Sequence, residues 1–386
     1  MLCQNSVRGA VRRVTVRGCS GVSAGASPLK RLVADASEFG ETASAAPDLN
    51  WATAPYAARA PRGGEQREQV DPTRTVVLLF PGEGAAHVGM GRRLANLPSA
   101  RDLYDLASSV VGWDVWRTCT EGPVEKLAAH APTAVLVTAL AALESARDSR
   151  PATLQRARAA AGFSLGELAA LAAAGALPVE RALRLAELRA AAVRAAAAAR
   201  SGAALTVWLA PDARLGPALA AAREHGLERG LEAPACAVAA YLHPGCRAIA
   251  GDEECVAWLE RNGRAWGILR AERAAAPALH SPLMAEAAAA MRAGVAAAGG
   301  VTAPRLRVVS AVDGRAVRGV GGVMRALSAG LAAPVRWEQT LQALYARPRG
   351  AAFPLTVALG PGGGALRASV RKVNARAWDS SLQIDV

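Results

Sequence analysis

The sequence predicts an α/β protein with a buried parallel sheet, and three observations carry that prediction. Residues 75–80 (TVVLLF) form a continuous apolar and β-branched run, which is typical of a strand covered on both faces of a parallel sheet. Residues 162–166 (GFSLG) match the G-x-S-x-G pattern of a sharp strand-to-helix turn. Residues 178–200 predict one long helix that ends at Ser201-Gly202.

Composition supplies material for a large core and excludes several classes of protein. The chain has 386 residues, enough for two domains, and its 52% apolar and 20% charged residues exclude general disorder. The longest apolar run, residues 131–143, is too short to span a membrane. Aromatic residues make up only 4%, which argues against a nucleic-acid partner. Six cysteines without a C-x-x-C pair exclude a zinc ribbon, and a disulfide scaffold is not expected in a chain of this length.

The N-terminal residues differ in composition from the rest of the chain. Residues 1–34 hold six Arg or Lys, several Ser and no acidic residue, and they lack the apolar segment of a secretory signal. This composition predicts a mitochondrial transit peptide and hence a matrix protein, with a disordered basic tail as the alternative. Residues 35–74, rich in Ala, Pro, Gly and Glu, predict a disordered linker.

A glycine-rich loop follows the first predicted strand. Residues 81–91 (PGEGAAHVGMG) carry four glycines, which permit backbone amides to approach a ligand closely. A dinucleotide motif would need glycine where His87 stands, and the Gly-Lys-Ser/Thr of a phosphate-binding loop is absent. Nucleotide binding is therefore disfavoured, while a structural turn and a ligand-binding loop both stay open.

Ser164 is the candidate nucleophile. A serine on a strand-to-helix turn needs small neighbours, and the N-terminus of the following helix offers free amides to an oxyanion. The preceding residues 158–162 (RAAAG) have poor strand propensity, and G-x-S-x-G arises by chance in a chain rich in Ala and Gly. A structural turn is the alternative.

Arg189 and His280 are the candidate partners of that serine. Arg189 lies in an apolar stripe of the helix 178–200, where a guanidinium is costly unless it meets an anion. It either pairs with a structural acid or clamps a substrate carboxylate. His280 lies in an apolar segment (ALHSPLM) before a predicted helix, residues 283–298. No acid has an obvious orienting position, so we expect a Ser–His dyad held by a backbone carbonyl, with a buried core histidine as the alternative.

Together these motifs resemble the malonyl-CoA:acyl carrier protein transacylase family, in its animal mitochondrial form. The resemblance runs from about Val76 to the C-terminus and rests on LLFPGEGAAHVGMG, AGFSLGELAALAAAGAL, ELRA, ALHSPLM, APVRWEQTLQALY and LGPGGG. It implies an α/β-hydrolase-like acyltransferase domain (75–201 and 274–386) interrupted by a small ferredoxin-like α+β domain (202–273). It also implies a monomer that needs no cofactor and no metal ion.

The periodicity of the insertion is compatible with that small domain. We expect strands at 204–209, 235–241 and 247–251, and helices at 215–225 and 253–262.

The resemblance also implies the roles of individual residues. Ser164 attacks malonyl-CoA with His280 as its base, Arg189 binds the malonyl carboxylate, and the phosphopantetheine thiol of an acidic acyl carrier protein then takes the malonyl group for type II fatty acid synthesis. The backbone amides of Glu83 and Leu165 form the oxyanion hole, and the carbonyl near Arg336 orients His280.

Departures from the family pattern keep other functions open. Glu83 replaces the first glutamine of G-Q-G-S-Q, and Ala240 and Ala311 replace two asparagines. The three residues that start at Pro132 stand where the family has a Gln-Pro-Ala motif. Each lost asparagine removes hydrogen bonds worth roughly 1 kcal/mol. A charge at Glu83 would oppose a malonyl carboxylate, but we expect its side chain to turn away and cap a helix. A weakened homologue that only binds acyl carrier protein, and a serine thioesterase or esterase, are the alternatives.

Overall fold

The computed structural model describes residues 72–347 and 350–386. The predicted transit peptide and most of the predicted linker lie outside these residues, and the linker's last residues form a short 3₁₀ helix, η3 (Pro72–Arg74). The larger sheet has five strands, all parallel, in the order β7-β2-β1-β8-β9. Its strands are β1 (Val76–Phe80), β2 (Ala157–Gly162), β7 (Arg307–Val308), β8 (Leu355–Leu359) and β9 (Ser381–Ile384).

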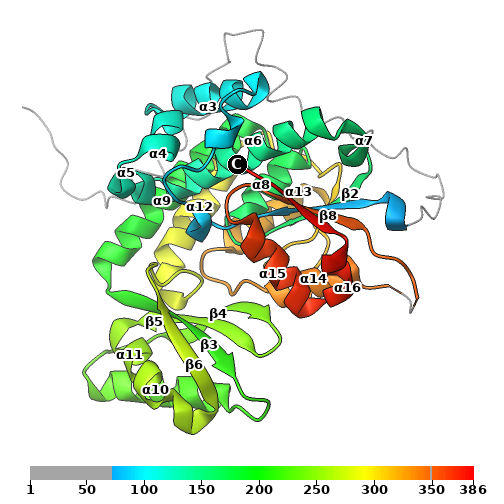
Figure 1. Ribbon diagram of the computed structural model, residues 1–386. Coiled ribbons are helices and arrows are strands. Elements are labelled where there is room, and N and C mark those ends of the chain that lie inside the picture. The colour runs from blue at the N-terminus through cyan, green and yellow to red at the C-terminus, as the bar shows by residue number, and fades with distance from the viewer. Residues whose placement is uncertain (1–71, 348–349) are drawn as a thin grey trace, which may run out of the picture.

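The central strand β1 confirms the prediction of a strand buried on both faces. All five of its residues are buried, and alternate side chains enter two different cores. Val76, Leu78 and Phe80 pack into the larger core, whereas Val77 and Leu79 pack into the smaller one. Helices therefore cover both faces of the sheet (Figure 1).

The helices of the larger core come mainly from the first two thirds of the described chain. They are α3 (Pro98–Val111), α4 (Val115–Glu121), α5 (Val124–Ala129), α6 (Ala131–Ser149), α7 (Pro151–Leu154), α8 (Gly166–Ala173), α9 (Val179–Ala199), α12 (Ala285–Ala298) and α13 (Gly319–Ala329). The smaller core is covered by α14 (Trp337–Tyr345), α15 (Gly363–Val373) and α16 (Ala375–Asp379). Short 3₁₀ helices fill the loops: η4 (Glu83–Ala85), η5 (Arg92–Leu94), η6 (Gly263–Trp266) and η7 (Pro282–Met284).

A second sheet forms a separate lobe between α9 and α12 in the chain (Figure 1). Its strands are antiparallel in the order β4-β5-β3-β6, and two helices join them in the βαββαβ pattern of a ferredoxin-like domain. The elements are β3 (Gly202–Leu209), α10 (Leu215–Glu228), β4 (Cys236–His243), β5 (Cys246–Asp252), α11 (Glu253–Asn262) and β6 (Ile268–Ala274). β6 was not predicted from the sequence, because three of its seven residues are charged and most of the strand is exposed.

The two lobes meet at a short stretch of backbone. The amide of Tyr241 in β4 donates to the carbonyl of Val335 (2.8 Å), and the amide of Val335 donates to the carbonyl of Ala239 (2.8 Å). Ala240, one of the replaced asparagines, pairs with Val335 in the same bridge. The small domain thus fixes the segment that precedes α14, and this segment contacts the site described next.

Candidate active site

The tight turn at Ser164 explains why its flanking residues are glycines. Ser164 lies between β2 and α8 with a φ of 53°, a left-handed conformation that a non-glycine residue rarely adopts. A Cβ atom on Gly162 would lie 1.8 Å from the backbone carbon of Gly166. One on Gly166 would lie 2.4 Å from the carbonyl oxygen of Phe80. The G-x-S-x-G pattern is therefore a steric requirement here, and not a chance match.

His280 comes from a distant part of the chain and meets this serine. It lies on the loop between β6 and η7, and its Nε2 is 2.7 Å from the Ser164 Oγ. Its φ is 59°, and within the described residues Ser164 and His280 are the two non-glycine residues with positive φ. Backbone strain of this kind concentrates at functional sites, because the surrounding structure must hold it in place.

Backbone carbonyls fix the tautomer of His280. Its Nδ1 lies 3.1 Å from the carbonyl oxygen of Ala333, and its own amide donates to Leu331 (2.9 Å). A carbonyl only accepts, so Nδ1 carries the proton and Nε2 is free to accept one from Ser164. The sequence placed the orienting carbonyl near Arg336, and the structure assigns it to Ala333, three residues earlier. The carbonyl of Arg336 itself accepts from Thr340 in α14.

The charge state of His280 suits a general base. Burial lowers its pKa to about 4, and the nearby positive charge of Arg189 adds to the effect. The carboxylate of Glu83 and the carbonyls of Ala333 and Gly330 oppose it. The imidazole is therefore neutral at pH 7 and can take a proton from the serine.

Arg189 on α9 is buried beside the dyad and contacts two groups. Its Nη2 donates to the Ser164 Oγ (3.0 Å), and its Nε donates to the Oε2 of Glu83 (2.8 Å). The expectation that the Glu83 side chain turns away to cap a helix is wrong. It pairs with the guanidinium instead, because η4 begins at Glu83 directly beside the serine turn.

Two backbone amides next to the dyad are open. Glu83 is the first residue of η4, and Leu165 immediately precedes α8. In the residues that the structure describes, neither amide donates to another backbone group, as expected at the start of a helix.

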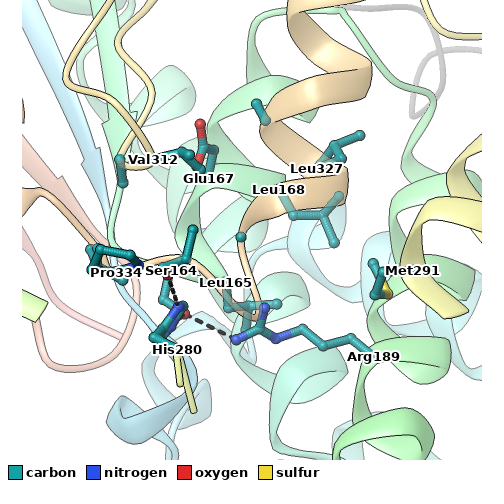
Figure 2. Close-up of a pocket in the computed structure, with 15 residues that line it drawn as sticks. Ser164, Leu165, Glu167, Leu168, Arg189, His280, Met291, Val312, Leu327 and Pro334 are labelled. Atoms are coloured by element: carbon teal, nitrogen blue, oxygen red, sulfur yellow. Dashed lines mark hydrogen bonds between the residues drawn. The ribbon is translucent and has the colours of Figure 1, made fainter. Parts of the chain in front are cut away.

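A cavity opens over the dyad, and the space between its lining atoms is about 470 Å³ when the open solvent at its mouth is included. Figure 2 shows Ser164, His280 and Arg189 converging at its base, with Met291 and Leu327 on the apolar wall. Ala311, the second replaced asparagine, also lines the cavity. An acyl group bound to the serine would thus be shielded from water on one side.

Glu167 also lines the cavity, and no sequence pattern singled it out as a site residue. It is buried on the first turn of α8, and burial raises its pKa to about 8. Hydrogen bonding from Ser310 and from the amide of Ala311 opposes that shift. The carboxyl group is neutral at pH 7 and adds no negative charge to the cavity.

Other candidates from the sequence lie away from the dyad. His87 is exposed, and Pro132 lies in the first turn of α6, where the neighbouring Thr133 donates to Glu187. Within residues 72–347 and 350–386, no cluster of three or more His, Cys, Asp or Glu could hold a metal ion. Over the same residues, no helix has the length and apolar character needed to cross a membrane.

A match to a known protein family defines the class of this protein. The acyl transferase domain family matches residues 77–353, which include the serine turn, Arg189, His280 and the whole small domain. The geometry of a Ser–His pair with two open amides agrees with acyl transfer.

Relatives and solved structures narrow that class. The chain is 41% identical over 321 residues to a probable mitochondrial malonyl-CoA-acyl carrier protein transacylase of Drosophila melanogaster, covering 82% of this chain and 84% of the relative. It is 36% identical to the mitochondrial transacylase of Homo sapiens, covering 82% and 81%. An acyl carrier protein S-malonyltransferase of Vibrio cholerae superposes with a TM-score of 0.71 at 25% identity, covering 81% and 97%. The chain therefore belongs to the malonyl-CoA-acyl carrier protein transacylase family.

Proposed function

We propose that this protein transfers a malonyl group from malonyl-CoA to the phosphopantetheine thiol of an acidic acyl carrier protein through a malonyl-serine intermediate. The observation that carries the proposal is the meeting of three groups at one atom. The Oγ of Ser164 lies within hydrogen-bond distance of a neutral base, His280 Nε2, and of a buried cation, Arg189 Nη2. A nucleophile, its base and a carboxylate-binding group are therefore in place together.

The first half-reaction follows from the proton positions. His280 Nε2 takes the hydroxyl proton as Ser164 Oγ attacks the thioester carbonyl, and the amides of Glu83 and Leu165 stabilise the oxyanion. The C–S bond then breaks, and the proton on Nε2 passes to the leaving CoA thiolate. The carbonyl of Ala333 keeps the other proton on Nδ1 throughout.

The second half-reaction is the same sequence with a different thiol. His280 takes the proton of the phosphopantetheine thiol, whose sulfur attacks the malonyl-serine ester. The ester C–O bond breaks and the serine oxygen recovers the proton. One solved structure similar to this chain shows a type II PKS acyl-carrier protein in complex with its malonyl-transacylase, at 26% identity and a TM-score of 0.68, covering 81% of this chain and 96% of the solved one.

The site favours transfer over the alternative functions. A neutral ester has no carboxylate to pair with a buried guanidinium beside the nucleophile, whereas a malonyl group has a carboxylate that can pair with Arg189. A homologue that only binds acyl carrier protein has no use for the strained backbone that holds Ser164 and His280 together.

Location and partner extend the proposal. The animal relatives are named mitochondrial, and we place this protein in the matrix, as a monomer that supplies type II fatty acid synthesis. Two arginines of β6 are already paired with acids on the small domain: Arg270 with Glu272, and Arg273 with Glu253 and Glu260. They contribute little free charge to the docking of an acidic carrier protein.

A transfer assay tests the proposal. Radiolabelled malonyl-CoA is incubated with the protein and phosphopantetheinylated acyl carrier protein, and label on the carrier protein is measured. We expect label with the native protein and none with Ser164→Ala. The proposal fails if the native protein leaves the carrier protein unlabelled, or if Ser164→Ala labels it at the native rate.

A further inference from the structure

Glu83 forms an ion pair with Arg189, the guanidinium that the proposed function assigns to the substrate carboxylate. We infer that Glu83 is a specificity-determining residue: its carboxylate competes with the malonyl carboxylate for Arg189, so the enzyme also accepts acyl groups without a carboxylate, such as acetyl. The inference rests on the proposed function, and it concerns the acyl selectivity of the same site.

The position of Glu83 is set by its backbone and not by a flexible side chain. The preceding Gly82 packs so closely on Phe163 that a Cβ atom would lie 2.9 Å from its ring and 3.0 Å from its carbonyl oxygen. The amide of Ala86 donates to the Glu83 carbonyl and closes the 3₁₀ turn. The Glu83 backbone therefore lies beside the serine turn, and the carboxylate lies 2.8 Å from the Arg189 Nε. Only 16% of the Glu83 side chain is exposed.

The charges around the serine balance before any substrate binds. Arg189 is positive, Glu83 is negative, and burial keeps both His280 and Glu167 neutral at pH 7. A malonyl group brings one more negative charge into this enclosed site, whereas an acetyl group brings none. A like charge at the same guanidinium disfavours the malonyl group, and acetyl pays no such penalty.

The guanidinium is also partly occupied in geometric terms. Nε is bonded to Glu83 and Nη2 to the serine hydroxyl. A bidentate contact to malonyl through Nε requires the bond to Glu83 to break, and one through Nη1 and Nη2 brings a second carboxylate onto a guanidinium that Glu83 already neutralises. With glutamine at position 83 the cation would be unpaired, and malonyl would supply its only carboxylate.

The ion pair between the exposed Arg200 and the buried Asp252 serves as an example of a structural ion pair in this chain. Arg200 grips Asp252 with two parallel bonds (Nε–Oδ1 2.6 Å and Nη2–Oδ2 2.8 Å), and the amide of Ala235 adds a third donor. The carboxylate of Glu83 receives a single bond, from the Arg189 Nε to Oε2, and no other donor in the described part of the chain bonds to that carboxylate. Its bond can be exchanged for a bond to substrate, as competition requires.

The experiment compares kcat/KM for malonyl-CoA and acetyl-CoA in the native protein, Glu83→Gln and a matched control. We expect a native malonyl-to-acetyl ratio below about tenfold, and a rise of at least about tenfold in Glu83→Gln. Glu187→Gln is the control, because it removes one negative charge from α9 two residues before Arg189. Its partners are His130 and Thr133, outside the cavity, so its ratio should stay native.

Three outcomes are decisive. A ratio in Glu83→Gln within about threefold of the native value overturns the inference while the proposed function stands. An equal rise in Glu187→Gln also overturns it, because the effect would then be general charge. Failure of both CoA esters to acylate the native protein refutes the proposed function itself. Glu83→Ala removes the same charge and must raise the ratio too, so the result does not depend on the folding of one variant.

Discussion

Replacing Arg189 by glutamine separates a substrate-binding role from a structural one. Truncating one partner of a buried charge-assisted pair costs about 2–5 kcal/mol, and each 1.4 kcal/mol is about tenfold. The expected loss for malonyl-CoA is therefore about 30-fold to a few thousand-fold. Because Glu83 already occupies the Arg189 Nε, we expect the lower end of that range. Acetyl-CoA has no carboxylate to lose and should be affected less.

The same substitution should also change the pH dependence of acylation. Arg189 helps to hold the pKa of His280 near 4, while Glu83 pushes it upward. Removing the cation leaves the carboxylate unopposed, so the pKa of His280 rises and activity is lost at a higher pH as the medium is acidified. A residue that only supported the fold would not shift this midpoint.

The assay is single-turnover acylation of the enzyme by each CoA ester across a pH series. Arg200→Gln serves as the control, because it also removes a guanidinium that pairs with a buried carboxylate, away from the dyad. Equal losses for both esters together with an unmoved midpoint would show that Arg189 is structural, and the account of the site would fail.

The remaining predictions concern the base and the turn. His280→Ala should slow acylation by about 10²–10⁴-fold, and a near-native rate would exclude the dyad. In the native protein, acylation should persist at pH 6.5 and fall as the pH approaches 4, because burial lowers the pKa of His280 to about 4; a fall centred at 6.5 would contradict that environment. Gly166→Ala should destabilise the fold by ~3 kcal/mol in urea titration, because its Cβ would meet the Phe80 carbonyl at 2.4 Å, and an unchanged midpoint would refute the steric argument.

The elements that the sequence predicted best are those where local pattern and packing agree. The run at 75–80 is fully buried in β1, and the helix expected at 253–262 is α11 with the same bounds. The poor strand propensity at 158–162 did not prevent β2 from forming, and its last residue, Gly162, is required because Gly166 approaches it closely. β6 escaped prediction because an edge strand with charged exposed residues has no apolar alternation.

The candidate site was predictable as a set of residues but not as a set of contacts. Sequence patterns identified Ser164, Arg189 and His280 as candidates, and the structure brings all three together. The direction of the Glu83 side chain depends on its contact with Arg189, which lies 106 residues away in the sequence, and no local pattern encodes that contact. The orienting carbonyl lies three residues before Arg336 for a similar reason, because the loop before α14 is placed by the small domain.

Mass spectrometry of the intact protein after incubation with malonyl-CoA alone tests whether Ser164 carries the malonyl group. We expect one malonyl group per chain, mapped to Ser164 in the peptide digest and discharged on addition of phosphopantetheinylated acyl carrier protein. Ser164→Ala should gain no mass under the same conditions. No adduct on the native protein, or an adduct that survives Ser164→Ala, would contradict the account.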